Sequence, residues 1–302
     1  MVEPQNIPRE QFPKSTSFSE GMITLDITPD NHEMYHIRDI KYISRPEAEL
    51  TIQLITPGWD VQKPPLIVFV TGSAFFWQDM AGSIPRLSLL ANKGFAVASV
   101  QYRGSEAAPF PAQMLDAKAA VRFMKMNADK YGIDGNNVFI MGDSSGGHTA
   151  LMAGFTAGIE EYEEDIYSEQ SSDVRGIIDL YGPVDISRMN DELSAFDHMV
   201  ADSPAGCLIG RKNVLENPEL VRPTIVTNYI SSAREIPPVL IIHGTNDEQV
   251  AFGQSCILYD KLKEHDKTAS FYAIDGAHHG GSVFWSERVL GIVSDFVHRF
   301  TL

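Results

Sequence analysis

Several features are scarce in this sequence of 302 residues, and each scarcity excludes a class of protein. The two cysteines, Cys207 and Cys256, are too few for a disulfide framework, which is typical of a protein from the reducing cytoplasm. No apolar run approaches the roughly 20 residues that a membrane-spanning helix needs. Residues 1–20 have neither a basic stretch nor an apolar core, so we expect no secretory signal there.

Positive charge is also scarce. Lysine and arginine number 24 against 40 aspartates and glutamates, and the formal net charge is −16. An acidic surface repels phosphates, which argues against nucleic acid and anionic membranes as partners. The histidines form no metal-ligand spacing with carboxylates or cysteines, so we expect no metal and no cofactor. The oligomeric state stays open, with a homo-oligomer among the alternatives. We interpret the acidic run at residues 160–165 as a solvated loop face.

Apolar residues, by contrast, are plentiful and follow an ordered pattern. Early strands are predicted at residues 22–27, 34–43 and 49–56, close enough together to pair antiparallel. Buried strands are then predicted at 66–70, 95–100, 138–141, 176–181, 239–243 and 270–274, and helices at 112–131, 145–157, 254–265 and 283–300. Strands that alternate with helices predict an α/β fold. We expect a mostly parallel central sheet with antiparallel N-terminal strands and helices on both faces.

One interval breaks this alternation. Residues 187–236 separate two predicted core strands and are far longer than a usual connection. We interpret them as a small helical cap inserted into a single domain that spans residues 1–302. An ordinary crossover with a loose loop is the weaker alternative, because one helix does not use so many residues.

The strongest motif lies at the end of the strand predicted at 138–141. Gly142-Asp143-Ser144-Ser145-Gly146-Gly147 follows it directly, and a helix of small residues comes next. A serine between glycines at −2 and +2 is typical of a nucleophile on a tight strand-to-helix turn, where larger side chains would collide. The helix N-terminus adds partial positive charge beside the reacting carbonyl. Ser144 is therefore the predicted nucleophile.

Two other interpretations of this motif are weaker. Ser145 has Asp143 in place of glycine at its −2 position. A phosphate-binding loop would need a lysine at the position that His148 occupies, so nucleotide binding is not favoured.

A nucleophilic serine needs a base, and the base needs an acid to fix its tautomer, in the chain order serine, acid, histidine. Asp247 follows the strand predicted at 239–243, at the sheet edge where α/β folds place their chemistry. Glu248 and Asp185 are weaker rivals for the acid. The base lies in the loop after residue 274, where His278 and His279 stand between glycines and cannot be separated by spacing.

Together these segments resemble the α/β-hydrolase serine esterases of the hormone-sensitive-lipase and bacterial feruloyl and acetyl esterase type. The resemblance runs from about Pro64 to the C-terminus and rests on the elbow, acid and histidine segments, with further matches at residues 102–103, 110–116 and 203–204. In that family the histidine immediately before glycine is the base, which implies His279.

The family usually has a His-Gly-Gly-Gly loop whose backbone N–H groups stabilise the oxyanion, and this chain departs from it. The matching segment is Thr71-Gly72-Ser73-Ala74. Because backbone donors survive a change of side chain, the resemblance implies an oxyanion hole formed by Ser73, Ala74 and Ser145. Three aromatic residues follow at once, and we expect them to line the substrate pocket: Phe75, Phe76 and Trp77.

The sequence thus predicts a serine carboxylesterase that hydrolyses small esters of short acyl or aryl groups through an acyl-enzyme, with Ser144, Asp247 and His279 as catalytic residues. The same residues could serve an amide-cleaving enzyme of the arylformamidase or peptidase kind. A non-catalytic binding module is much less favoured, because such proteins usually lose a member of the triad.

Overall fold

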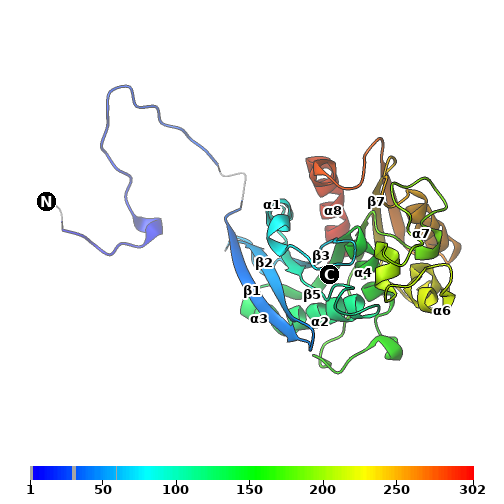
Figure 1. Cartoon of the computed structure of the whole chain (residues 1–302). Coiled ribbons are helices and arrows are strands. Elements are labelled where there is room, and N and C mark those ends of the chain that lie inside the picture. Colours follow the sequence, from blue (N-terminus) through cyan, green and yellow to red (C-terminus); the bar gives the residue numbers. More distant parts are fainter. Residues whose placement is uncertain (1–2, 29–31, 59) are drawn as a thin grey trace. The chain divides into compact units, whose positions relative to one another are not determined.

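The computed structural model describes residues 3–28, 32–58 and 60–302 (Figure 1). Its contacts divide the chain into a unit that runs to Asn31 and a unit that runs from His32 to Leu302. No helix in the described residues is long and apolar enough to cross a membrane.

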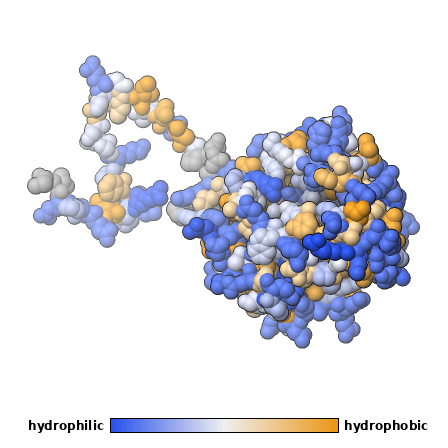
Figure 2. All heavy atoms as spheres, viewed as in Figure 1, coloured by the Kyte–Doolittle hydropathy of each residue, from blue (hydrophilic) through white to orange (hydrophobic). Residues whose placement is uncertain are grey.

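In the first unit, the only regular element of the described residues is the short 3-10 helix η1 (Arg9–Gln11). The strand predicted at residues 22–27 is wrong, because the structure assigns no strand there. A strand needs a hydrogen-bonded neighbour, and this segment pairs with none of the described strands. Its alternating side chains Ile23, Leu25 and Ile27 are instead exposed. Figure 2 shows that hydrophobic residues occur along this unit.

The second unit is built on an eight-stranded sheet in the order β1-β2-β4-β3-β5-β6-β7-β8. The strands are β1 (Met34–Ser44), β2 (Glu49–Pro57), β3 (Pro65–Val70), β4 (Ala96–Val100), β5 (Asp134–Asp143), β6 (Ile177–Leu180), β7 (Val239–Gly244) and β8 (Ala269–Ile274). The strand β2 pairs antiparallel with β1 and β4, and all other pairs are parallel. The predicted α/β fold, with its N-terminal antiparallel strands, is confirmed.

Helices cover both faces of this sheet (Figure 1). They are α1 (Met80–Ala91), α2 (Ala112–Met126), α3 (Ala128–Tyr131), α4 (Ser145–Phe155), α7 (Gly253–Glu264) and α8 (Glu287–Phe300). The sheet therefore has a core on each face, and β3 contributes to both. Leu66, Val68 and Val70 face a core shared with α2, α4 and α7. Ile67 and Phe69 face a second core shared with α1 and α8. Alternation of side chains along each strand therefore supplies both cores.

Two expected helices are interrupted, and one helix was not expected. Asn127 separates α2 from α3, and Ser286 separates the short 3-10 helix η6 (Ser282–Trp285) from α8. The helix α1 contains Pro85, which made it hard to predict, but Asp79 caps its N-terminus by accepting N–H groups of the first turn.

Residues 187–236 contain only short helices, among them α5 (Pro204–Leu208), α6 (Pro218–Val221) and the 3-10 helices η4 (Arg222–Thr224) and η5 (Val226–Tyr229). Their apolar side chains, among them Met189, Met199 and Ile209, form a small core together with Ile186 and Val250. The acidic run is less solvated than expected, because Glu163 pairs with Lys118 and Arg122 of α2.

Candidate active site

The predicted nucleophile lies on a sharp turn between β5 and α4. Ser144 has φ 54° and ψ −128°, a backbone conformation that side-chain-bearing residues rarely adopt. The two flanking glycines are needed for close packing. A Cβ on Gly142 would lie 2.1 Å from the carbonyl oxygen of Gly146, and a Cβ on Gly146 would lie 2.0 Å from that of Val70. The motif therefore encodes the turn that exposes the Ser144 hydroxyl.

The structure brings His279 to this serine, and Asp247 to His279. His279 Nε2 lies 2.9 Å from Ser144 Oγ, and His279 Nδ1 lies 2.7 Å from Asp247 Oδ2. Because a carboxylate only accepts hydrogen bonds, Nδ1 carries the proton and Nε2 is free to accept from the serine hydroxyl. These are the contacts that a general base and its orienting acid require.

Asp247 is held as an ionised group. Burial alone would raise the pKa of its carboxyl, but hydrogen bonds from His243 and His279 bring that pKa far below its usual range. The other oxygen, Oδ1, accepts the backbone N–H groups of Gln249 and Val250, both at 2.8 Å.

The rival residues lie elsewhere. The His278 side chain is 71% exposed and its Nδ1 lies 3.1 Å from Glu248 Oε2. Asp185 accepts the backbone N–H and the hydroxyl of Ser187. Neither Glu248 nor Asp185 contacts the imidazole of His279 among the hydrogen bonds of the described residues.

The loop after β3 differs from expectation at one residue. The Ser73 N–H, expected in the oxyanion hole, donates to Ser145 Oγ at 2.9 Å and is therefore occupied. The Gly72 N–H donates to Asp143 Oδ1 at 2.7 Å. The N–H groups of Ala74 and Ser145 have no hydrogen-bond acceptor within the described residues, and both residues line the cavity beside Ser144. Two backbone donors without an acceptor in the described residues thus belong to residues that line the cavity beside Ser144.

Side chains brace this loop where the esterase family has a histidine. The Tyr102 hydroxyl donates to the Thr71 carbonyl at 2.9 Å and lies 3.1 Å from Ser73 Oγ. Asp143, which holds the Gly72 N–H, is itself 3.2 Å from the guanidinium of Arg86 on α1. Sequence reasoning missed these braces, although Asp143 stands next to Ser144 in the chain.

A cavity of about 270 Å³ opens beside the serine. Its walls are mostly apolar, and several come from residues 187–236. The lining residues are Ala74, Phe75, Ser144, Ser145, Pro183, Ile186, Met189, Phe196, His198, Pro204, Ala205, Gln249, Val250 and His279.

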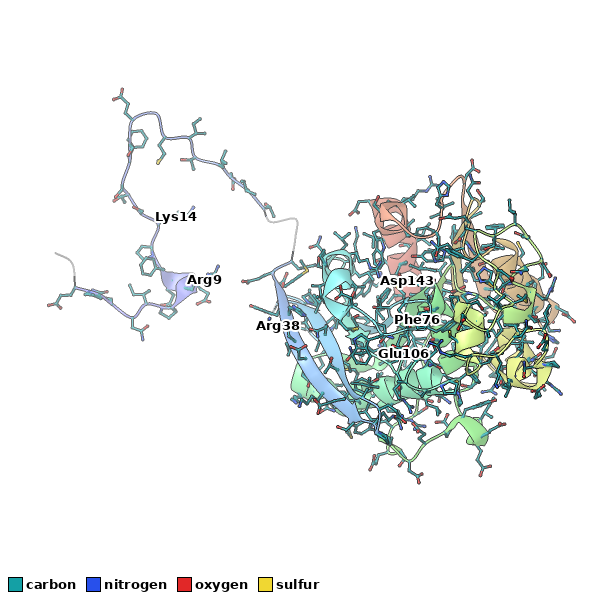
Figure 3. The ribbon with its side chains drawn as sticks, viewed as in Figure 1. Arg9, Lys14, Arg38, Phe76, Glu106 and Asp143 are labelled. Atoms are coloured by element: carbon teal, nitrogen blue, oxygen red, sulfur yellow. The ribbon has the colours of Figure 1, made fainter. Side chains whose placement is uncertain are left out.

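Of the three aromatic residues expected in the pocket, only Phe75 lines this cavity. It packs edge-on against His148, with ring centroids 5.3 Å apart. Phe76 and Trp77, which were also expected there, are not among its lining residues. Trp77 is 50% exposed, and its N–H donates to Glu106. Figure 3 labels Phe76, Glu106 and Asp143 in this part of the molecule.

His148 on α4 contacts the segment of residues 187–236. Its Nε2 lies 2.9 Å from the carbonyl oxygen of Thr224, and burial lowers its pKa to about 4, so the ring is neutral. Among the described residues, no group of three or more histidine, cysteine, aspartate or glutamate side chains could hold a metal ion.

Comparison with known proteins assigns the chain to a family. The BD-FAE family model matches residues 52–262, and the chain belongs to that family. It is similar to the esterase LipC of Mycobacterium tuberculosis, with 27% identity over 253 residues, which cover 82% of this chain and 61% of LipC. The chain thus spans about three fifths of that relative's length.

Two solved structures share the fold. One, described as a truncated form of a carbohydrate esterase from gut microbiota, has a TM-score of 0.79 and 28% identity, covering 90% of this chain and 98% of its own. The other, the bifunctional GH43-CE of Bacteroides eggerthii, has a TM-score of 0.78 and 30% identity, covering 92% of this chain and 39% of its own. The α/β-hydrolase fold and the resemblance to esterases predicted from the sequence are confirmed.

Proposed function

We propose that this chain, as a member of the BD-FAE family, is a serine carboxylic ester hydrolase that works through an acyl-enzyme. The observation that carries the proposal is the continuous hydrogen-bonded series from Ser144 Oγ through His279 to Asp247, at 2.9 and 2.7 Å. It ends beside an apolar cavity and two backbone N–H groups that have no other acceptor in the described residues. The esterase names of the similar proteins support the same reaction class.

In the proposed reaction, His279 Nε2 takes the proton of Ser144 as its oxygen attacks the ester carbonyl. The N–H groups of Ala74 and Ser145 stabilise the tetrahedral oxyanion, and such donors are each worth about 3 kcal/mol of barrier. His279 then gives the proton to the departing alkoxide. Water, activated by the same imidazole, hydrolyses the acyl-enzyme and restores the serine.

We propose a preference for short acyl or aryl groups. Phe75 from the oxyanion loop and Met189 and Phe196 from residues 187–236 line the cavity, and its volume of about 270 Å³ leaves little space beyond a small ester. We further propose that residues 187–236 act as a cap over this space. An acyl chain that outgrows the cavity would meet overpacking in place of further burial.

The reaction is tested with p-nitrophenyl acetate, butyrate, octanoate and palmitate, acetylated sugars, and matched anilides. We expect kcat/KM to be highest for acetate or butyrate and anilides to be poor substrates. A steady rise through octanoate would contradict the short-acyl preference, since an open channel gains up to about 0.8 kcal/mol per methylene. Anilides cleaved faster than esters would favour the amide-cleaving alternative.

We also propose a cytoplasmic location. Both cysteines are unpaired, and Cys207 is buried, which is typical of a protein kept in a reducing environment. Fractionation of the source cells, with an antibody against the chain, tests this.

A further inference from the structure

A second histidine also contacts the carboxylate of Asp247. His243 is at the end of β7, and its side chain is fully buried. Its Nε2 lies 3.1 Å from Asp247 Oδ2 and 2.9 Å from the carbonyl oxygen of Val250. Its Nδ1 lies 2.7 Å from the hydroxyl of Ser255 on α7, which is also fully buried. The ring does not line the cavity.

These contacts fix the tautomer of His243. Nε2 faces a carboxylate and a carbonyl, and both groups can only accept, so Nε2 carries the proton. Nδ1 must then accept a hydrogen bond, and the Ser255 hydroxyl is the donor that faces it. Ser255 therefore holds His243 in the form that donates to Asp247.

The result is one carboxylate oxygen shared by two imidazoles. Oδ2 of Asp247 lies 2.7 Å from His279 Nδ1 and 3.1 Å from His243 Nε2. A donor to Oδ2 draws off part of its negative charge and so weakens the hold of the carboxylate on a protonated His279. It also fixes the plane of the carboxylate, as outer partners of functional groups commonly do.

We propose that His243, held by Ser255, is a positioning residue that orients Asp247 and moderates its basicity toward His279. This inference rests on the proposed function, because it assigns a role within the same triad. The series runs from Ser255 through His243, Asp247 and His279 to Ser144, and only its last two members line the cavity.

Other charged groups near these imidazoles do not replace His243. Tyr181 packs on His279 with ring centroids 4.9 Å apart and on His243 at 6.3 Å, and burial keeps its pKa well above the usual value. Its neutral hydroxyl leaves the charge of Asp247 uncompensated. Glu248 and the exposed His278 pair with each other on the outer side of the loop.

Asp143 and Arg86, whose charges act on Tyr181, pair with each other. Phe252, whose ring centroid lies 5.5 Å from that of His243, is uncharged. Among the described residues, the side chains that donate a hydrogen bond to Asp247 Oδ2 are therefore His279, the proposed base, and His243.

The pair His243→Asn and His243→Gln tests the proposal. Asparagine can reach the position of Nδ1 and accept from Ser255 but is too short to donate to Asp247. Glutamine can place an amide nitrogen near the position of Nε2. We expect His243→Asn to lower kcat by about 10- to 100-fold with little change in KM, as loss of a hydrogen bond to a charged group would.

The pH profile separates positioning from packing. Without the donor, Oδ2 holds protonated His279 more strongly, so the acid limb of kcat/KM should move to higher pH by about 0.5 to 1 unit in His243→Asn. His243→Gln should restore most of kcat and return the limb toward wild type. Ser255→Ala keeps the imidazole, removes a single oxygen, and should move the limb in the same direction by less.

A matched control is a second serine–histidine pair at an exposed contact, in which Ser232 Oγ lies 3.0 Å from His265 Nδ1. His265→Asn should leave kcat and the pH profile unchanged. The proposal is overturned if the acid limb stays in place in both His243→Asn and Ser255→Ala, or if glutamine is no better than asparagine. If His243→Asn does not fold, Ser255→Ala alone decides by the same criterion. Labelling of Ser144 by a fluorophosphonate in wild type shows separately whether the proposed function stands.

Discussion

Asp179 gives the chain a stability that should depend on pH in an unusual direction. This residue of β6 is completely buried in a narrow space beneath α4. A Cβ on Gly147 or on Gly182 would lie 2.3 or 2.5 Å from its Oδ1. The Gly182 N–H donates to Oδ1 at 3.0 Å, and Oδ2 has no hydrogen-bond partner within the described residues. Within the described residues, no ion pair includes the Asp179 carboxyl.

Burial raises the pKa of Asp179 to about 8, and the single hydrogen bond from Gly182 opposes this only in part. In the unfolded chain the pKa is about 3.9. Between these values the unfolded state binds fewer protons than the native state, so stability falls as pH rises. The slope from this one group is up to about 1.4 kcal/mol per pH unit, and it vanishes below about pH 4 and above about pH 8.

Asp179→Asn removes this titration and keeps the shape and the Oδ1 acceptor for Gly182. The free energy of unfolding of the variant should exceed that of wild type by a margin that grows with pH. Between pH 5 and pH 8 the margin should increase by up to about 4 kcal/mol. Urea unfolding followed by tryptophan fluorescence measures it at each pH.

The matched control is Asp129→Asn, because the Asp129 side chain is 94% exposed. The free energy of unfolding of Asp129→Asn should stay within about 0.5 kcal/mol of the wild-type value at every pH. A margin for Asp179→Asn that is constant from pH 5 to pH 8 would refute the reasoning, since it would mean that the carboxyl titrates alike in both states.

Three further predictions concern the catalytic site. His279→Ala should lower kcat on p-nitrophenyl acetate by about 10⁴-fold and His278→Ala by less than about threefold; a reversed order would mean that the base is the wrong histidine. Tyr102→Phe removes the hydroxyl that braces the oxyanion loop and should lower kcat by about 3- to 30-fold with KM nearly unchanged, whereas an unchanged kcat would show that the loop needs no brace. Phe196→Ala should raise kcat/KM for octanoate relative to acetate, and an unchanged ratio would exclude Phe196 as a limit on acyl length.

The parts of the fold that the sequence predicted are those with local signals. The apolar runs of β3, β5 and β7 are buried on both faces, and each lies where its run predicts a strand. Residues 22–27 carry a different strand signal, an alternation of apolar side chains, but no strand pairs with them in the described chain. Pairing is a property of the whole sheet, so alternation alone could not decide it.

The candidate site likewise has residues that the sequence predicted and residues that it could not predict. Ser144, Asp247 and His279 follow strand ends in a fixed order, and the order could be read from the chain. The partners behind them could not, because Ser255 reaches His243 from a different element. The oxyanion loop was predicted as a segment. Which of its N–H groups remain free depends on side chains such as Ser145, because its hydroxyl accepts a hydrogen bond from the Ser73 N–H.

The central claim is that the Ser144 hydroxyl is the nucleophile, and a covalent label tests it most directly. The protein is treated with a fluorophosphonate, and the modified residue is identified by mass spectrometry of its peptides, alongside the Ser144→Ala variant. We expect one phosphonyl group per chain, on Ser144, with esterase activity lost in proportion to labelling. The variant should take up no label and retain less than about 10⁻⁴ of wild-type kcat. A label on Ser145, or full activity in a folded Ser144→Ala variant, would contradict the account.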